Sequence, residues 1–314
     1  MRTAVIDIGT NSTRLLIADV SPAGQISELS RRSIVTRLGA GVDSTGALAE
    51  AAQARVVDAL EQFRPELERL QPERNLAVLT SAVREASNGA EFAKRIGKSF
   101  GLDARVLSGD EEARLTFLGA MSEQSSASTE TQAQGQPTVV IDIGGGSTEF
   151  VVGVDRQAGF HVSLDAGVVR MSERHIHSDP PDPAQLQALA ADTRSIFLQG
   201  LPAHEGEAVQ RGIAVAGTAT SAAAIDQALD PYDPVRVHGY TLLLATVELL
   251  LARLADMTED QRRSVVGLDP SRAPTIVAGM ILLSQAMRMF DLDRVEVSEH
   301  DILYGGALML AGLA

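Results

Sequence analysis

The sequence predicts an α/β protein made of two related lobes, each with a mixed β-sheet flanked by helices. The main observation is an internal repeat: residues 5–13 return 135 residues later, at 140–148, with Val, Ile, Asp, Ile, Gly, Ser and Thr in the same positions. Each half opens with strand-like segments and continues with alternating helical and strand patterns. The length of 314 residues also exceeds the size at which one hydrophobic core normally stops growing. Duplication of one lobe accounts for these features.

In the first half, short apolar runs between turn residues predict strands, and apolar residues at helical spacing predict helices. The strands lie at 3–20 (two strands joined by the turn Gly9–Ser12), near 26–35, at 76–80 and at 104–107. The helices lie at 47–70, through Phe92 to about Phe100, and from Glu112 to about Ser122. Ser108 and Glu111 have the spacing of a capping box, which marks the start of the last of these helices.

The second half repeats this organisation after a polar segment. Strands are expected at the second copy of the repeat, at 160–164, 213–215 and 295–297, and helices near 183–200, 241–255, 258–266, 273–290 and 304–313. Residues 122–137 lack periodicity and are rich in Ser, Gln and Thr, as in a flexible connection. We therefore expect an N-terminal domain at 1–123, a linker at 124–136 and a C-terminal domain at 137–314, whose last helix could pack back toward the first domain.

Composition and charge exclude several classes of protein. The formal charge of −14 argues against non-specific nucleic-acid binding, which needs a basic face. The chain has no apolar run long enough for a transmembrane helix, and its N-terminus does not resemble a signal peptide. It contains no Cys, which excludes thiolate chemistry and fits a cytoplasmic protein. An acidic protein can bind a polyanion only through a locally cationic site with metal ions.

The two copies of the repeat each place a Gly- and hydroxyl-rich loop after a buried strand that ends in Asp. Such a loop brings backbone N–H groups and hydroxyls close to an anion. The first loop, Asp7–Ser12, could equally be a tight hairpin turn. The second, Asp142–Glu149, contains three consecutive Gly residues, which a purely structural turn explains poorly. Phosphate binding is therefore favoured at the second loop.

Carboxylates near the second loop suit a divalent cation. Asp142 closes the strand and Glu149 lies just beyond the loop. Carboxylate, phosphate and water oxygens are the ligands that Mg²⁺ and Mn²⁺ prefer. The alternative for Glu149 is an exposed strand residue.

Two further side chains are candidates for chemistry on phosphorus. Glu111 is used by the capping box, which leaves Glu112 free to orient and deprotonate a water, although acidic residues in a first turn commonly serve the helix dipole. Arg84 follows a strand and could hold a terminal phosphate, or form a salt bridge with Glu85, or lie on the surface. The turn at Gly217 is either a third anion site or a well-capped helix start.

Taken together, these motifs resemble the exopolyphosphatase/guanosine pentaphosphate phosphatase (Ppx/GppA) family. The most specific combination is Ser-Gly-Asp-Glu-Glu-Ala-Arg-Leu at 108–115 with Asp-Ile-Gly-Gly-Gly-Ser-Thr-Glu at 142–149, and the resemblance spans nearly the whole chain. It implies two actin-like domains of ribonuclease H-like fold, with the active site in the cleft between them. It also implies a cytoplasmic enzyme linked to the stringent response, and a homodimer.

The resemblance implies a role for each matching residue. The catalytic glutamate falls on Glu112, and the Mg²⁺-associated carboxylates fall on Asp142 and Glu149, with Mn²⁺ as an alternative metal and Asp7 holding the metal through water. The phosphate contacts fall on Asn11, Ser12, Arg84, Gly144, Gly145, Gly146, Ser147 and Thr148.

Two departures from the family pattern bear on the substrate. Many relatives carry Gly-Leu-Arg-Glu-Gly near the end, whereas this chain has Asp-Ile-Leu-Tyr-Gly at 301–305, so the expected cationic contribution is missing. The chain also stops at Ala314, without the HD-like extension of longer relatives. We therefore expect a preference for short polyphosphates.

The function expected is release of terminal orthophosphate from inorganic polyphosphate, or of the 5′ γ-phosphate from guanosine pentaphosphate. Neither nucleic acid nor membrane is expected as a partner. A small-molecule kinase of the same superfamily is the first alternative and predicts acceptor-dependent ATP consumption. A non-enzymatic phosphate or nucleotide sensor is the second, and it predicts binding without turnover. Fold analogy does not separate these functions.

Overall fold

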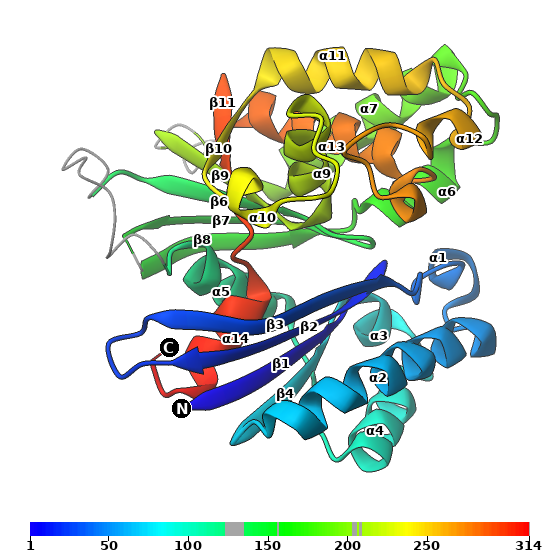
Figure 1. Cartoon of the computed structure of the whole chain (residues 1–314). Helices are drawn as coiled ribbons and strands as arrows, with labels where there is room; N and C mark the ends of the chain where they lie inside the picture. The colour runs from blue at the N-terminus through cyan, green and yellow to red at the C-terminus, as the bar shows by residue number, and fades with distance from the viewer. Residues whose placement is uncertain (123–134, 156, 203–205, 207–208, 314) are drawn as a thin grey trace. The chain divides into compact units, whose positions relative to one another are not determined.

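The computed structural model describes residues 1–122, 135–155, 157–202, 206 and 209–313 (Figure 1). It forms two compact units, Met1–Thr129 with His300–Ala314, and Glu130–Glu299. Residues 124–134 of the expected linker lie outside the described part of the chain. The final helix belongs to the first unit. The domain expected from the sequence was 137–314, with a last helix that could pack back toward the first domain.

The first unit contains a five-stranded mixed sheet with the order β3-β2-β1-β4-β5. The strands are β1 (Arg2–Ile8), β2 (Ser12–Val20), β3 (Ile26–Val35), β4 (Arg74–Leu79) and β5 (Ala104–Val106). The first three are antiparallel neighbours, and β4 and β5 run parallel to β1. Because parallel strands end at the same edge, the loop after β1 and the segment after β4 lie side by side.

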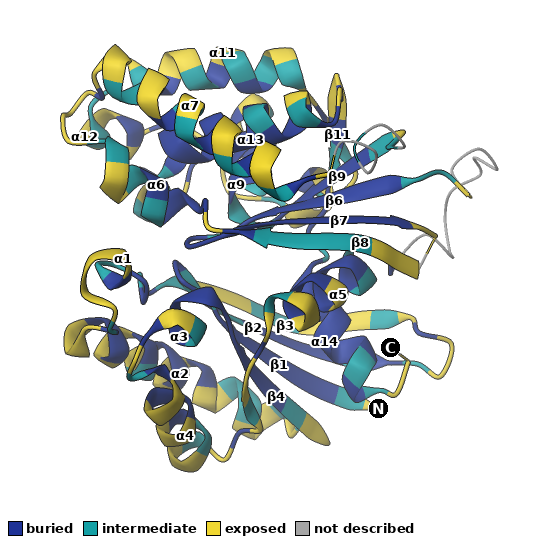
Figure 2. Cartoon of the chain, turned by 180° about the vertical axis from the view of Figure 1, so that it is seen from behind, coloured by how far each residue is buried: buried dark blue, intermediate teal, exposed yellow. Residues whose placement is uncertain are grey.

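Helices cover both faces of this sheet (Figure 2). One face carries α2 (Glu50–Leu70) and α4 (Gly89–Phe100), and the other carries α5 (Gly109–Ala120) and α14 (Ile302–Leu310). Side chains of β1 alternate between them: Ile6 and Ile8 pack in the α2 core, and Val5 packs in the α14 core. Asp7, two residues after Val5, therefore lies on the α5–α14 face. Two short helices, α1 (Val42–Thr45) and α3 (Ser81–Glu85), complete the unit.

Glycines allow α5 and α14 to pack backbone against backbone. A Cβ on Gly119 would lie 1.9 Å from the Asp301 carbonyl oxygen, and one on Gly305 would lie 1.9 Å from that of Leu115. These contacts, together with the buried apolar face of α14, make the last residues of the chain part of the first unit's core.

The second unit contains a six-stranded mixed sheet with the order β10-β11-β9-β6-β7-β8. Its strands are β6 (Thr138–Ile143), β7 (Thr148–Val154), β8 (Gln157–Leu164), β9 (Arg211–Val215), β10 (Tyr240–Leu243) and β11 (Arg294–Val297). The part β8-β7-β6-β9 repeats the order and directions of β3-β2-β1-β4. The duplication and the mixed sheets predicted from the sequence are therefore confirmed.

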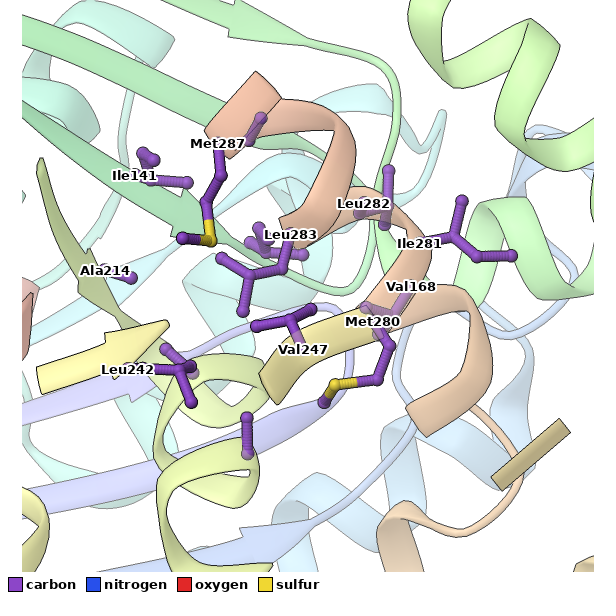
Figure 3. Packing of buried hydrophobic residues seen from close by; sticks show 14 of the residues in the cluster. Ile141, Val168, Ala214, Leu242, Val247, Met280, Ile281, Leu282, Leu283 and Met287 are labelled. Atoms are coloured by element: carbon purple, nitrogen blue, oxygen red, sulfur yellow. The ribbon is translucent and has the colours of Figure 1, made fainter. Parts of the chain in front are cut away.

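In the described part of the second unit, helices pack on one hydrophobic core. They are α6 (Val168–His175), α7 (Pro183–Gly200), α9 (Ala216–Asp226), α10 (Pro234–Val237), α11 (Leu244–Ala255), α12 (Glu259–Arg262) and α13 (Ile276–Met289), with the 3-10 turn Pro270–Arg272. Figure 3 shows Met280, Leu283 and Met287 of α13 among the buried side chains of this core. In the described ranges, no helix is long and apolar enough to cross a membrane.

Two of the helices expected in the second half are shorter than predicted. The pattern near 241–255 begins with β10, because Tyr240–Leu243 pairs with β11 before α11 starts. The pattern near 258–266 contains only the four-residue α12. In both places apolar residues at helical spacing occur in segments that tertiary pairing or turns hold in another conformation.

Candidate active site

The first loop, between β1 and β2, has its carbonyl groups occupied by neighbouring backbone. The Gly9 N–H donates to the Ser12 carbonyl at 2.9 Å, and the carbonyls of Thr10 and Asn11 accept N–H groups from the segment 36–39 at 2.8–3.0 Å. The Thr10 and Asn11 N–H groups, by contrast, donate to no backbone carbonyl in the described residues. Both residues are buried, and buried N–H groups normally have a partner. This arrangement suits an anion.

The second loop, between β6 and β7, repeats this pattern. The Gly144 N–H donates to the Ser147 carbonyl at 2.9 Å, and the carbonyls of Gly144 and Gly145 accept the N–H groups of residues 168–170 at the start of α6. The Gly145 and Gly146 N–H groups donate no backbone hydrogen bond within the described ranges. Two equivalent loops thus present N–H groups in the manner of an anion-binding nest.

The glycines of the second loop fit against the start of α6. A Cβ on Gly167 would lie 2.4 Å from backbone atoms of Gly145 and Gly146, so only Gly fits there. The Arg170 Nε donates to the Gly146 carbonyl at 2.8 Å. The Thr148 hydroxyl donates to the Ala166 carbonyl at 2.5 Å, so it stabilises the loop. The start of α6 therefore fixes the shape of the loop, because its N–H groups donate to the loop carbonyls.

Asp142 and Glu149 are directly opposite each other in the β6–β7 pair. Residues in that relation project from the same face of a sheet, and both are buried, at 8% and 1% exposure. The alternative that Glu149 is an exposed strand residue is therefore wrong. The Ser163 hydroxyl donates to Glu149 Oε1 at 2.7 Å. Two carboxylates on one face offer the hard oxygen ligands that Mg²⁺ and Mn²⁺ prefer.

In the first unit, the equivalent pair consists of Asp7 and Arg14. Arg14 occupies the position of the repeat that Glu149 occupies in the second unit. Its Nε and Nη2 both donate to Asp7 Oδ2, at 2.9 and 2.6 Å. Asp7 Oδ1 is buried and has no hydrogen-bond partner in the described part of the chain. Burial raises the pKa of the Asp7 carboxyl, although Arg14 opposes this.

The expected metal carboxylates come from both units: Asp7 belongs to the first unit, and Asp142 and Glu149 belong to the second. Within the described ranges, no three His, Cys, Asp or Glu side chains are grouped so that they could hold a metal ion. The Asp142–Glu149 pair has the chemistry for Mg²⁺, which usually takes one or two protein carboxylates and keeps several waters.

Glu112 is held by Arg84 near the start of α5. The predicted capping box of Ser108 and Glu111 is confirmed, so Glu111 faces the helix end, and Glu112 is buried at 7% exposure. Arg84 Nη1 donates to Glu112 Oε2 at 2.9 Å and to the Leu107 carbonyl at 2.9 Å. Burial raises the pKa of Glu112 to about 7, Arg84 opposes the rise, and the charge of Asp7 adds to it.

The first loop and the Arg84 helix are linked by side chains. The Thr10 and Ser81 hydroxyls form a hydrogen bond of 2.9 Å, which connects the loop to the start of α3. Arg84 lies on α3, and its bond to Glu112 connects α3 to α5. The structure thus brings Asn11, Ser12, Arg84 and Glu112 into the first unit, around the ends of β1 and β4.

Two arginines at these loops, and a third at the Gly217 turn, were not singled out from the sequence. Arg14 pairs with Asp7, Arg170 bonds to Gly146, and the Arg272 guanidinium packs against Gly217, where a Cβ would lie 1.7 Å from its Nη1. The sequence does contain a signal for Arg14, because the repeat places it at the position that Glu149 occupies in the second copy. Arg272 had none, because 55 residues separate it from Gly217.

Comparisons with known proteins found similar sequences and similar solved structures. A model of the Ppx/GppA phosphatase family matches residues 16–307. Exopolyphosphatase 2 of Mycobacterium tuberculosis is 38% identical over 99% of both chains. The exopolyphosphatase of Cytophaga hutchinsonii has a TM-score of 0.87 at 26% identity, over 100% of this chain and 99% of that one. A Ppx/GppA family member of Aquifex aeolicus has a TM-score of 0.81 at 28% identity, over 99% and 97%. The expected α/β fold class, with a mixed sheet flanked by helices in each half, is confirmed.

Proposed function

Because the chain belongs to the Ppx/GppA phosphatase family, we propose that it hydrolyses the terminal phosphoanhydride bond of inorganic polyphosphate and releases orthophosphate. The observation that carries this proposal is the buried Glu112, whose pKa is raised to about 7 and whose carboxylate is oriented by Arg84. A general base works best when its pKa lies near the operating pH, because it is then both ionised and basic. The similarity to two proteins named exopolyphosphatases supports the substrate class.

In the proposed mechanism, Glu112 accepts a proton from water while the water oxygen attacks the terminal phosphorus. The bond from phosphorus to the bridging oxygen breaks, and the shortened chain leaves with that oxygen. The transition state is loose, so placement and charge neutralisation contribute most of the rate. The Arg84 guanidinium lies 2.9 Å from Glu112 and suits the terminal phosphoryl oxygens.

The two loops supply the phosphate contacts in this proposal. The N–H groups of Asn11, Gly145 and Gly146 donate hydrogen bonds to phosphate oxygens, and the hydroxyls of Ser12 and Ser147 add further hydrogen bonds. Gly144 keeps the loop closed through its own bond to Ser147. Thr148 acts on the loop's shape, because its hydroxyl is already donated to Ala166. That both loops serve one ligand stays a prediction.

Asp142 and Glu149 would hold Mg²⁺, or Mn²⁺, with Asp7 acting through water. When bound, the metal neutralises phosphate charge and orients the phosphoryl group. The buried position of Asp142 directly opposite Glu149 supports this assignment. Asp7 fits a supporting role, because one of its oxygens is taken by Arg14 and the other has no partner in the described residues.

Substitution of Glu112 tests the catalytic assignment. We expect Glu112→Gln to lower kcat for phosphate release from polyphosphate by ~10²–10⁴-fold, which is the usual contribution of a general base. The matched control is Glu111→Gln, the adjacent residue, where Gln preserves the capping box and the charge change is the same. A kcat for Glu112→Gln within about twofold of the wild type would overturn the assignment.

The finer choice of substrate is tested by parallel assays. Phosphate release from tripolyphosphate, long-chain polyphosphate, guanosine pentaphosphate and ATP distinguishes the proposed activities from one another. Better kinetics on long chains would remove the expected preference for short ones. ATP consumption that requires an added acceptor would instead support the kinase alternative.

We also propose that the protein is a cytoplasmic homodimer with a role in the stringent response. The family resemblance supports these statements, and the absence of Cys from the sequence fits a reducing compartment. Sedimentation equilibrium measures the oligomeric state directly, and a monomer at micromolar concentration would contradict the dimer.

A further inference from the structure

We infer that Asp301 is a positioning residue for the metal site: it anchors Arg14 from the side opposite Asp7, and so keeps Asp7 Oδ1 available to a metal-bound water. Asp301 lies at the start of α14, where the sequence departs from the Arg-containing pattern of many relatives. This inference rests on the proposed function, since it assumes that Asp7 serves a divalent cation through water.

The hydrogen bonds of Arg14 carry the argument. An arginine that faces one carboxylate commonly engages both oxygens with its fork. Here Nε and Nη2 both donate to the same oxygen, Asp7 Oδ2, and Nη1 donates to Asp301 Oδ2. The bond to Asp301 fixes the rotation of the guanidinium. Without it, Arg14 could turn to bind both oxygens of Asp7 and occupy Oδ1.

The charges at this cluster point in the same direction. The Arg14 guanidinium is shared between the Asp7 and Asp301 carboxylates, and the charge of Arg31 also acts on Asp301. Loss of the Asp301 charge would leave Arg14 with Asp7 as its one ionised hydrogen-bond partner among the described residues, which favours a contact with both Asp7 oxygens.

Asp301 is itself rigidly held, as a positioning residue must be. Its Oδ1 accepts the Leu303 N–H at 3.0 Å and so caps α14. Its carbonyl packs against Gly119 of α5, where there is no room for a Cβ. The residue is 2% exposed. Its position relative to β2 is therefore fixed by the packing of α14 on α5 (Figure 1).

The effect of Asp301 on metal binding can be separated by experiment from its role as the cap of α14. The cap needs only a side-chain oxygen, and Asn caps helices as well as Asp does. Asp301→Asn therefore preserves the cap and the side-chain shape while it removes the charge and one strong acceptor for Arg14. A measurement of metal affinity therefore distinguishes a role in positioning Arg14 from a role in the stability of the fold.

The test is titration of the full-length protein with Mn²⁺, without substrate, followed by the electron paramagnetic resonance signal of the free ion. We expect Asp301→Asn to raise the Kd for Mn²⁺ by ~10-fold, since loss of a residue that supports a metal site typically costs 10–100-fold in affinity. The Mg²⁺ concentration needed for half-maximal phosphate release should rise in proportion, with kcat at saturating Mg²⁺ within about threefold of wild type.

The control is Asp19→Asn. Asp19 is directly opposite Arg2 in the same pair of strands and forms the same kind of ion pair, so this variant removes an arginine-paired carboxylate away from the site. Its Kd for Mn²⁺ should equal that of the wild type. If Asp301→Asn does not fold, Asp301→Ser keeps a capping oxygen, removes the charge and carries the same expectation.

The inference would be overturned if a folded Asp301 variant bound Mn²⁺ with the same Kd as the wild type. Failure of the proposed function gives a different result, because the wild-type chain would then release no phosphate from polyphosphate in the presence of Mg²⁺. The two failures are therefore distinguishable within one set of measurements.

Discussion

Glu112 combines burial with a strong partner, Arg84, and this combination determines how the site should respond to pH. The carboxyl is surrounded by protein, which favours its neutral form, while Arg84 favours the ionised form. The balance leaves the pKa at about 7. A base of this kind is half ionised at neutral pH.

We expect kcat to fall as the pH decreases through about 7, because protonated Glu112 cannot accept a proton from water. Arg84→Met should move this fall in kcat (the acidic limb of the pH profile) to higher pH, since loss of the guanidinium removes the main group that favours ionisation of Glu112. Initial rates at saturating polyphosphate and Mg²⁺ between pH 5.5 and 9 measure both effects. Arg105→Met, at an exposed ion pair with Asp103, is the control. A limb that stays in place in Arg84→Met would contradict the role of this ion pair.

The same shift predicts that Glu112 costs stability. Its folded pKa of about 7 exceeds the value of 4.5 for a free Glu, so the folded state binds more protons between these pH values. Stability from this group is therefore lost as the pH rises from 4.5 to 7 and stays lower above it. The difference corresponds to about 3 kcal/mol at most, since one pKa unit is about 1.4 kcal/mol.

We accordingly expect Glu112→Gln to raise the free energy of unfolding at pH 8, by up to about 3 kcal/mol, and to change it little at pH 4.5. Urea denaturation at both pH values measures this. Glu111→Gln provides the comparison, because Glu111 is exposed and its pKa is lowered by the bonds of the capping box. A lower stability of Glu112→Gln at pH 8 would mean that its attraction to Arg84 outweighs burial.

Local spacing identified some of these residues and could not identify others. Ser108 and Glu111 are three residues apart, so the capping box that separates Glu111 from Glu112 is visible in the sequence. Arg14 could also have been identified from the sequence, because the repeat aligns it with Glu149. Asp301 was not, since its partner Arg14 is 287 residues away and only the fold of α14 onto the first unit brings them together.

Each phosphate loop depends on the helix or segment that binds its carbonyls. In the second unit, N–H groups at the start of α6 donate to the loop carbonyls, and Gly167 allows the helix to approach Gly145 and Gly146. The loop sequence is visible in the repeat, but α6 was not predicted, because Val168–His175 is short and follows directly on a strand and turn. The sequence therefore predicted the loop without the helix that shapes it.

We expect Gly167→Ala to weaken phosphate binding although it changes no ligand of the phosphate. Its Cβ would meet the Gly145–Gly146 backbone at 2.4 Å, so the loop must move. The KM for polyphosphate should rise by about 10-fold or more, because each displaced N–H group loses a charge-assisted hydrogen bond of about 1.5–3 kcal/mol. Gly159→Ala, in β8, is the control, since its Cβ meets only the Val152 carbonyl at 3.3 Å. Equal KM values for the two variants would contradict this account of the loop.

The fold of the whole chain follows from two lobes of one pattern, and this part of it was predictable. The repeat gave both mixed sheets, because an apolar strand, a Gly turn and a second strand recur in register. The sequence did not reveal to which unit the last fifteen residues belong. Their apolar pattern predicts a helix, but periodicity does not say which sheet the helix covers, and α14 packs on β1 and α5 through glycine contacts.

We expect removal of residues 300–314 to unfold the first unit and leave the second folded. The deletion would expose the apolar face formed by Val5, Leu16 and Val78, which α14 buries with Leu303 and Leu308. Each large side chain that loses its burial costs about 1.5–3 kcal/mol, and several are lost at once, so the cost approaches the total stability of a domain. The core of the second unit contains no residue of this segment.

Amide hydrogen exchange followed by mass spectrometry can test this on the two parts of one molecule. In the shortened chain, peptides from β1, β2 and β4 should exchange within seconds, whereas peptides from β6, β9 and α13 should keep their protection. A chain that ends at Ala311, and so keeps all of α14, is the control and should exchange like the full-length protein. Protection of β1 in the chain that lacks 300–314 would show that the first lobe folds without α14, and that the terminal helix contributes Asp301 to the site without supporting the core.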